Sequence, residues 1–209
     1  ETTTMTVEDL FRNRDLATAL RAHQQSMVDE INSLSAEYVL NTPTDSVIQY
    51  FIEKYMLKVP QLNEANITSD YSDSWNTLTD KYEGRTYRQP GTTIVFFVPY
   101  QGDDWLLKYR PSTYTLHYVK AEIKSTELVF GYFRDFSGFN GHDDRQAEAV
   151  RANFHHDLKH VKDSLLQVEK DVEVFLSSMK TAAKNQLQLR KNKFLQDRGI
   201  GESLGFPLR

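Results

Sequence analysis

Two histidines, His156 and His160, stand four residues apart within His156-Asp157-Leu158-Lys159-His160. On a helix this spacing places both imidazoles on one face, as in the zinc-protease signature, where two histidines bind the metal ion and a glutamate acts as base. Here aspartate replaces that glutamate, and a third ligand would have to come from elsewhere. The apolar residues of the segment lie on the opposite side of the helix. We therefore favour a solvated histidine-rich face, and we expect no metal ion or other cofactor.

A second candidate set joins Asp103 or Asp104 to the segment Glu122-Ile123-Lys124. Restriction-type nucleases hold Mg²⁺ with a carboxylate at one strand end and with the glutamate of a Glu-x-Lys motif, whose lysine helps to activate water. Alternation along a strand puts Glu122 and Lys124 on one face, as that chemistry requires. That nuclease core expects a helix next, whereas here another apolar strand-like run follows. A solvated strand face is the favoured interpretation, and a nuclease site at Asp104, Glu122 and Lys124 is the alternative.

Basic residues gather toward the end of the sequence. Residues 180–209 carry seven basic and two acidic side chains, a net charge of +5, whereas residues 1–80 carry 13 acidic and five basic ones, a net charge of −8. Such a segment can bind nucleic acid or an acidic partner, and it can also neutralise the acidic N-terminal region within the fold or in a dimer. The candidate contact residues are Lys184, Arg190, Lys191, Lys193 and Arg198.

Composition limits the classes of protein to which the chain can belong. The 209 residues are 39% hydrophobic and 26% charged, which is typical of a folded globular chain of one domain or two small ones. There is no cysteine, which excludes disulfides, cysteine-bound zinc, iron–sulfur clusters and thiol catalysis. There is also no run of about 18 apolar residues that would form a transmembrane helix. We expect a cytoplasmic protein with no membrane partner.

Two helices are expected near the N-terminus, over residues 7–35 and 43–58. The first has a cap-like start at Thr6 with Asp9 three residues later, followed by leucine, methionine and isoleucine residues at helical spacing. The second begins with Thr42 as cap and with Pro43 at the first helical position.

An antiparallel sheet of about four strands, a meander, is expected over residues 93–134. Its strands are predicted at Ile94–Val98, Trp105–Tyr109, around residues 116–123 and at Leu128–Phe133, with a turn at Pro90-Gly91 before them. The many aromatic residues of this segment are expected to form core. Residues 62–92 are polar and allow no choice between strand and helix.

A very long helix is expected over residues 143–198. Apolar residues recur at steps of three and four from Ala147 to Ala182, which resembles a heptad pattern. At 1.5 Å per residue it would span roughly 80 Å. It therefore either breaks near Ser177-Ser178 into a hairpin or pairs with another copy of the chain. The glycines that follow predict a linker over residues 199–209 toward a missing C-terminal domain.

The chain resembles the N-terminal region of multidomain bacterial proteins found among defence genes. The resemblance rests on Val98-Pro99-Tyr100-Gln101-Gly102-Asp103, on Arg110-Pro111-Ser112, and on a long helix closing in Arg190-Lys191, Asp197-Arg198 and the segment Ser203-Leu204-Gly205-Phe206-Pro207-Leu208. In those proteins a separate C-terminal effector follows, which in some looks like a restriction-type nuclease. The resemblance implies a catalytic centre beyond Arg209, so that Glu122 and Lys124 would not be catalytic.

These observations predict an α+β fold: residues 1–142 form a body and residues 143–198 a helical arm. The expected function is a non-catalytic sensing or oligomerisation module of a defence-like protein. The long helix would form a homo-oligomer or transmit a signal to a C-terminal effector domain of the same chain. The alternatives are a nucleic-acid-binding module that uses the basic segment 180–198, and a Mg²⁺-dependent nuclease. Whether the chain is an enzyme stays open, although the motifs favour a non-enzymatic role.

Overall fold

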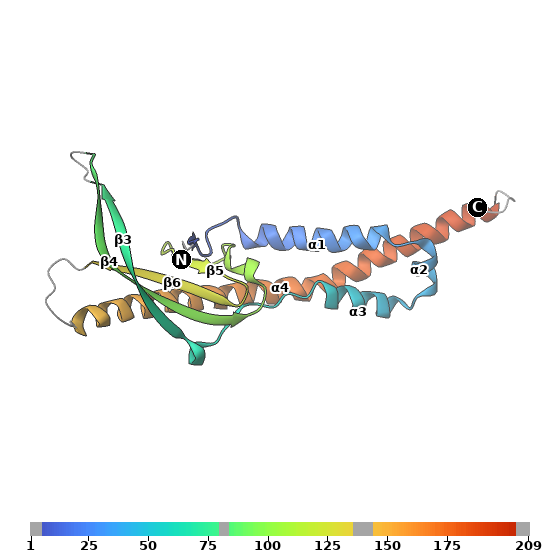
Figure 1. Cartoon of the computed structure of the whole chain (residues 1–209). Helices are drawn as coiled ribbons and strands as arrows, with labels where there is room; N and C mark the ends of the chain where they lie inside the picture. Colours follow the sequence, from blue (N-terminus) through green and yellow to red (C-terminus); the bar gives the residue numbers. More distant parts are fainter. Residues whose placement is uncertain (1–5, 80–83, 136–143, 204–209) are drawn as a thin grey trace. The chain divides into compact units, whose positions relative to one another are not determined.

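The structure is a computed structural model that describes residues 6–79, 84–135 and 144–203. It is an α+β fold with an antiparallel sheet, helices near the N-terminus and one long C-terminal helix, as the sequence predicts (Figure 1). None of the helices in these three ranges is at once long enough and apolar enough to cross a membrane.

The chain divides into two compact units, which we call the sheet unit and the helical unit. Their bounds are Glu1–Asn13 with Val59–Gln167 for the sheet unit, and Arg14–Lys58 with Val168–Arg209 for the helical unit. The longest helix, α4 (Asp144–Ser203), contributes residues to both. This division differs from the predicted body and arm because the two stretches of α4 pack against different parts of the chain.

In its described residues, the sheet unit has six antiparallel strands. They are β1 (Glu8–Asp9), β2 (Gln61–Leu62), β3 (Thr68–Thr79), β4 (Thr86–Gln101), β5 (Lys120–Ile123) and β6 (Glu127–Asp135). Their order is β1-β5-β6-β4-β2, and β3 pairs with β4 as well. The predicted antiparallel sheet is confirmed, although it begins before residue 93 and β6 separates β4 from β5.

Aromatic side chains join the sheet to the first stretch of α4. Phe96 on β4 and Phe130 on β6 are cross-strand partners. Both rings contact Phe154 of α4, with centroid separations of 4.1 Å and 5.6 Å, respectively. Phe130 and Phe154 are buried, and α4 runs along this face of the sheet (Figure 1). The prediction that aromatic residues form core holds for this cluster.

The strands β3 and β4 continue beyond the end of β6 as a two-stranded ribbon. The predicted turn at Pro90-Gly91 is wrong, because both residues lie inside β4. Pro90 is tolerated there because the pairing with β6 stops at Gly91, so the missing N–H of Pro90 leaves no gap in that ladder. A side chain at Gly91 would collide with the Arg134 backbone and the Phe133 ring, so the glycine serves close packing.

The predicted strand Trp105–Tyr109 is also wrong. The 3₁₀ helix η2 (Asp104–Leu107) lies there, and a second one, η1 (Glu64–Asn66), precedes β3. Leu106 and Leu107 are adjacent and both fully buried, which suits a helical turn better than a strand with alternating faces. The strand predicted around residues 116–123 begins only at Lys120.

The helical unit consists of three helices and the second stretch of α4. The helices are α1 (Leu16–Ser33), α2 (Ala36–Asn41) and α3 (Thr44–Lys54). Leu16, Met27 and Ile31 of α1 are fully buried, as are Val47 and Phe51 of α3. Helix α1 also reaches α4 through a contact between His23 and Phe175, whose ring centroids lie 6.1 Å apart.

The helix predicted over residues 7–35 begins later and ends earlier. Residues 8–9 form β1, where Glu8 pairs with Ala121, and α1 starts only after Asp15. Pairing with β5 satisfies the backbone groups that a helix would have used. The chain bends again before α2, because the Ser35 hydroxyl accepts a hydrogen bond from the Tyr38 amide and so caps a new helix.

Helix α4 does not break at Ser177-Ser178. Their hydroxyls donate to the carbonyls of Val174 and Phe175 at 2.7 Å, which satisfies both side chains within the helix. The helix also includes residues 199–203, so the predicted linker starts too early; residues 204–209 lie outside the described residues. The apolar stripe is buried within the two units, at Phe154, Leu158, Val161, Leu165, Val168, Val172, Phe175, Met179, Ala183 and Leu187.

Candidate metal centre

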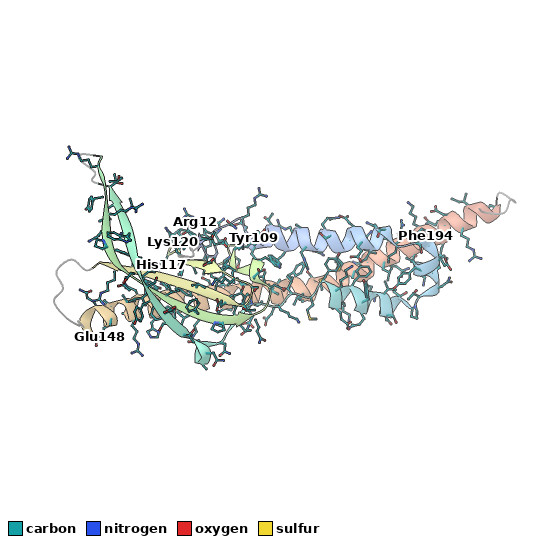
Figure 2. All side chains as sticks on the ribbon, viewed as in Figure 1. Arg12, Tyr109, His117, Lys120, Glu148 and Phe194 are labelled. Carbon is teal, nitrogen blue, oxygen red and sulfur yellow. The ribbon has the colours of Figure 1, made fainter. Side chains whose placement is uncertain are left out.

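Three histidines of the sheet unit come together on the polar side of α4. His156 and His160 lie one helical turn apart on α4, and His117 comes from the loop between η2 and β5 (Figure 2). One ring nitrogen from each lies within 4.8 Å of those of the other two. The ring centroids are separated by 4.3 Å for His117–His160, 4.6 Å for His156–His160 and 5.1 Å for His117–His156.

The local fold explains why these rings meet. Phe154 and Leu158 are buried, which turns His156 to the exposed side of α4 and leaves His160 half-buried. The loop that carries His117 is anchored just beyond it, where the Leu10 amide donates to the Val119 carbonyl at 2.8 Å. Packing of α4 on the sheet and pairing of β1 with β5 therefore set the two sides of the cluster.

The Asp157 carboxylate orients one ring of the cluster through a hydrogen bond. One carboxylate oxygen accepts a hydrogen bond from His117 Nε2 at 3.2 Å, and the other accepts one from the Tyr132 hydroxyl at 2.8 Å. Since a carboxylate only accepts, Nε2 of His117 donates in this bond, which makes Nδ1 the ring nitrogen that a metal ion would use. A carboxylate that orients a metal-binding histidine in this way is a common outer partner of metal sites.

The surroundings of His160 favour its neutral imidazole form. Burial lowers the pKa of His160, and the neighbouring His117 and His156 lower it further. Burial and the Asp157 carboxylate raise the pKa of Tyr132, so that this phenol remains a hydrogen-bond donor. Neutral imidazole is the form that binds metal ions.

The arrangement can hold a zinc ion once the rings rotate inward. Zinc binds imidazole nitrogen at about 2.0–2.1 Å, which puts the nitrogens of a tetrahedral site about 3.4 Å apart. The three nitrogens here are within 4.8 Å of one another, so a movement on the order of 1 Å closes the site. Three histidines leave a fourth position for water or another ligand.

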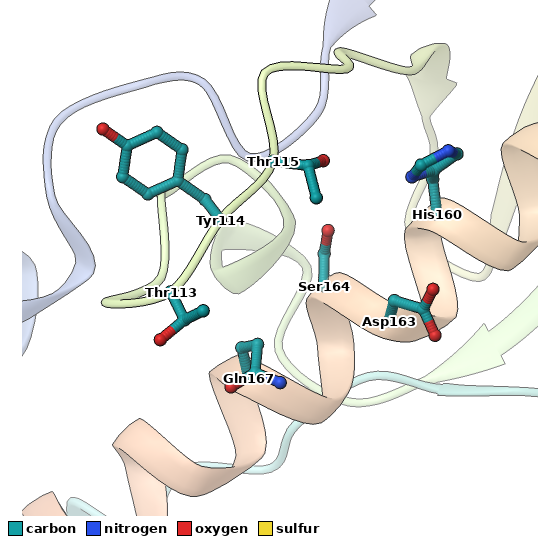
Figure 3. Close-up of a pocket in the computed structure, with 7 residues that line it drawn as sticks. All are labelled: Thr113, Tyr114, Thr115, His160, Asp163, Ser164 and Gln167. Carbon is teal, nitrogen blue, oxygen red and sulfur yellow. The ribbon is translucent and has the colours of Figure 1, made fainter.

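An open pocket of about 130 Å³ adjoins the cluster at His160 (Figure 3). The loop lines one side of it with Thr113, Tyr114 and Thr115, and α4 lines the other with His160, Asp163, Ser164 and Gln167. Figure 3 shows the loop passing above this stretch of α4. The pocket gives solvent and small solutes a route to His160.

Sequence reasoning named two of the three histidines as candidate ligands, although it favoured a solvated face without a metal ion. It placed His156 and His160 on a polar helix face and required a third ligand from elsewhere; His117 is that ligand candidate. No local pattern marks His117, which lies 39 residues before His156 in a loop between η2 and β5. Asp157, which occupies the position of the protease base, has both its oxygens engaged by His117 and Tyr132.

The proposed nuclease residues lie elsewhere in the sheet unit. Asp104 opens η2, and Glu122 lies on β5 opposite Val129. The Lys124 ammonium lies 3.3 Å from the Glu127 carboxylate. The backbone carbonyl of Lys124 accepts a hydrogen bond from the Tyr100 hydroxyl at 2.6 Å. A metal site needs at least three potential ligand side chains close together. Within the described ranges, the three histidines are the group that meets this condition. The nuclease site stays an untested prediction.

The predicted basic contact residues fall into two kinds. The Arg190 guanidinium donates to the Leu34 carbonyl at 3.0 Å and lies 4.3 Å from the centre of the Phe194 ring, so it helps to hold the helical unit together. Lys184, Lys191 and Lys193 make no ion pair or hydrogen bond with the residues that the structure describes. Arg198 is exposed near the end of α4.

No protein-family model, curated protein or solved structure matches this chain. The predicted relation to defence-associated proteins therefore stays a prediction.

Proposed function

We propose that the chain is a non-catalytic sensing module that binds a divalent transition-metal ion, with zinc as the best fit, through His117, His156 and His160. The observation that carries the proposal is the convergence of three imidazole nitrogens within 4.8 Å, from a loop and from α4. Imidazole is a ligand that suits zinc, copper and nickel, whereas Mg²⁺ and Ca²⁺ prefer oxygen.

Sensing is favoured over hydrolysis because of the role of Asp157. Its carboxylate is held by His117 and Tyr132, so it orients a ligand instead of standing free as a general base. An ion at this site would tie the loop that carries His117 to α4. Helix α4 contributes residues to both units, so binding would act on the element that the units share.

Metal titration of the whole chain tests the site. Cobalt(II) bound by three histidines gives visible absorption bands, and zinc should displace it with one ion per chain. We expect His117→Ala and His160→Ala each to weaken binding by at least about 100-fold. His155→Ala is the matched control, because His155 is an exposed neighbour on α4 that lies outside the cluster. Equal effects of His155→Ala and His117→Ala would contradict the site.

Hydrogen exchange tests the sensing role separately. Zinc should slow amide exchange in residues 111–119 and in the part of α4 around His156, because the ion joins the two segments. Zinc binding without any such protection would leave the metal site standing and refute the sensing role.

The wider setting of the module is part of the same proposal. We place it in the cytoplasm, as a sensing region of a defence-like protein with an effector beyond Arg209, on the resemblance of its motifs. Self-association through α4 is included, but the buried stripe is already packed inside the chain, so a second copy would have to use other residues. Light scattering at high protein concentration tests this, and a strict monomer would refute self-association.

A further inference from the structure

Four basic residues of α4 lie in one line within the helical unit. They are Lys180, Lys184, Lys191 and Arg198. At 100° per residue, all four fall within about 40° of one another around the helix axis, and they extend over about 27 Å along it. We call them the basic stripe.

The basic stripe runs beside the buried apolar stripe of α4, since at 100° per residue the buried Leu187 lies about 20° from Lys180 and about 60° from Lys184 around the helix axis. Lys180, Lys184 and Arg198 are exposed and Lys191 is half-buried. The three lysines have neither an ion pair nor a hydrogen bond with any described residue. The alternative in which these lysines neutralise the acidic N-terminal helices therefore has no support from contacts in the described part of the chain.

Two other basic residues of the same helix segment are placed differently. Arg190 is bound to the Leu34 carbonyl and stacked on Phe194. Lys193 is exposed but lies about 180° from Lys184 around the helix. The segment therefore has a built-in comparison: a line of aligned cations, one structural arginine and one isolated lysine on the other side.

The chemistry of the stripe fits phosphate better than a lipid surface or a specific carboxylate. Lysines are flexible point charges that contact backbone phosphates without reading sequence. Helices that lie on membranes need a broad apolar face, and the apolar face of this stretch is buried through Met179, Ala183 and Leu187. Beside the stripe, the Gln188 amide donates to Asn192 Oδ1 at 2.8 Å, which leaves the Asn192 amide group able to donate to a phosphate oxygen.

We propose that the basic stripe of α4 binds the phosphate backbone of a nucleic-acid duplex without sequence specificity. The proposal concerns a different surface and a different ligand from the metal centre. It also narrows the predicted set of five contact residues. Lys184, Lys191 and Arg198 belong to the proposed interface, and Lys180 joins them. Arg190 and Lys193 lie outside it.

Fluorescence anisotropy with labelled 20-base-pair DNA and RNA duplexes tests this proposal. The full chain should bind with an affinity that falls steeply with salt, and the slope of log K against log[salt] should reach about −3 for three or four contacts. The double variant Lys184→Glu/Lys191→Glu should weaken binding by at least about 10-fold and reduce that slope by about 2. Lys193→Glu is the control for a change in net charge alone, and it should change the affinity by less than about 2-fold.

Three results would overturn the proposal. Binding that is absent or insensitive to salt would exclude a phosphate interface. A loss of affinity on Lys193→Glu as large as that of the double variant would show that the position of the charges does not matter. Tighter binding to polyglutamate or to phosphatidylserine vesicles than to either duplex would assign the stripe to an acidic protein or a membrane. Circular dichroism of each variant controls for folding, and measurements with and without EDTA separate this site from the metal centre.

Discussion

The two stretches of α4 carry the same kind of apolar stripe but differ on their polar sides. In the sheet unit, Phe154 and Leu158 pack inward while the polar side gathers His156, His160 and the incoming His117. In the helical unit, Val172 and Met179 pack inward in the same way. There the polar side carries lysines that make no hydrogen bond or ion pair with a described residue.

This difference shows what turns a helix face into a site. Periodicity decides which side of a helix is buried, and it works equally well in both stretches. A cluster forms only where another part of the chain is held against the polar side, as the loop with His117 is. Where no such element is present, the side chains remain available to a partner outside the chain.

The largest expected effect comes from truncating one buried core residue in each unit, which should destabilise that unit alone. Phe154→Ala should destabilise the sheet unit by about 3–5 kcal/mol, because it removes the ring that contacts both Phe96 and Phe130. Met179→Ala should destabilise the helical unit by about 2–5 kcal/mol, since Met179 is fully buried. Hydrogen exchange resolved by segment should show each loss in its own unit.

The control for both changes is Val174→Ala, because Val174 is 71% exposed on the same helix. It should change stability by less than about 0.5 kcal/mol. If Phe154→Ala and Met179→Ala increased exchange equally in both units, the units would fold as one and the comparison would have to be abandoned.

Zinc should stabilise the sheet unit and leave the helical unit unchanged, and this difference in stability is slightly smaller than the effects of the core substitutions. At a free concentration 100 times its dissociation constant, the ion should stabilise the sheet unit by about 2.7 kcal/mol, because it binds only the folded cluster. Exchange in β6 should slow accordingly, and exchange in α3 should not change. His156→Ala should abolish the effect, and equal protection of α3 would indicate that the ion stabilises both units together.

Sequence reasoning predicted features that depend on local periodicity and missed those that depend on distant contacts. The buried positions of α4 from Phe154 to Met179 follow from their spacing alone. The ribbon of β3 and β4 escaped prediction because its polar side chains, with Trp75 exposed, lack the alternation of a half-buried strand. His117 escaped it because its partners lie far along the chain.

A third prediction compares two adjacent basic residues of the helical unit. Arg190→Ala should destabilise the unit by about 1–2 kcal/mol, because it removes the hydrogen bond to the Leu34 carbonyl and the packing on Phe194. Lys191→Ala should change stability by less than about 0.5 kcal/mol, since this lysine has no partner among the described residues. Urea denaturation measures both. A larger loss for Lys191→Ala would contradict the assignment of Arg190 as structural and of Lys191 as free for a partner.

The smallest expected effect is a pH dependence of the helical unit. Glu30 of α1 is bound by the Lys54 ammonium and by the Tyr55 hydroxyl, at 2.7 Å for the latter, and these hydrogen bonds lower its pKa below the ordinary value of 4.5. A carboxylate with a lowered pKa stabilises the fold above pH 4.5, and this stabilisation is lost as the pH falls through the lowered value. The pair is partly exposed, so solvent weakens the effect.

Glu30→Gln should therefore lower the melting temperature of the helical unit by roughly 2–4 °C at pH 7 and by progressively less below pH 4.5. The amide keeps the size of the side chain but loses the charge that Lys54 binds. Glu53→Gln on α3 is the control, because among the described residues the Glu53 carboxylate accepts a hydrogen bond from Gln49 alone, on the same helix. If the melting temperature of Glu30→Gln fell with decreasing pH just as that of the unchanged protein does, the charges joining α1 to α3 would contribute nothing to stability. Apolar packing alone would then hold the helical unit together.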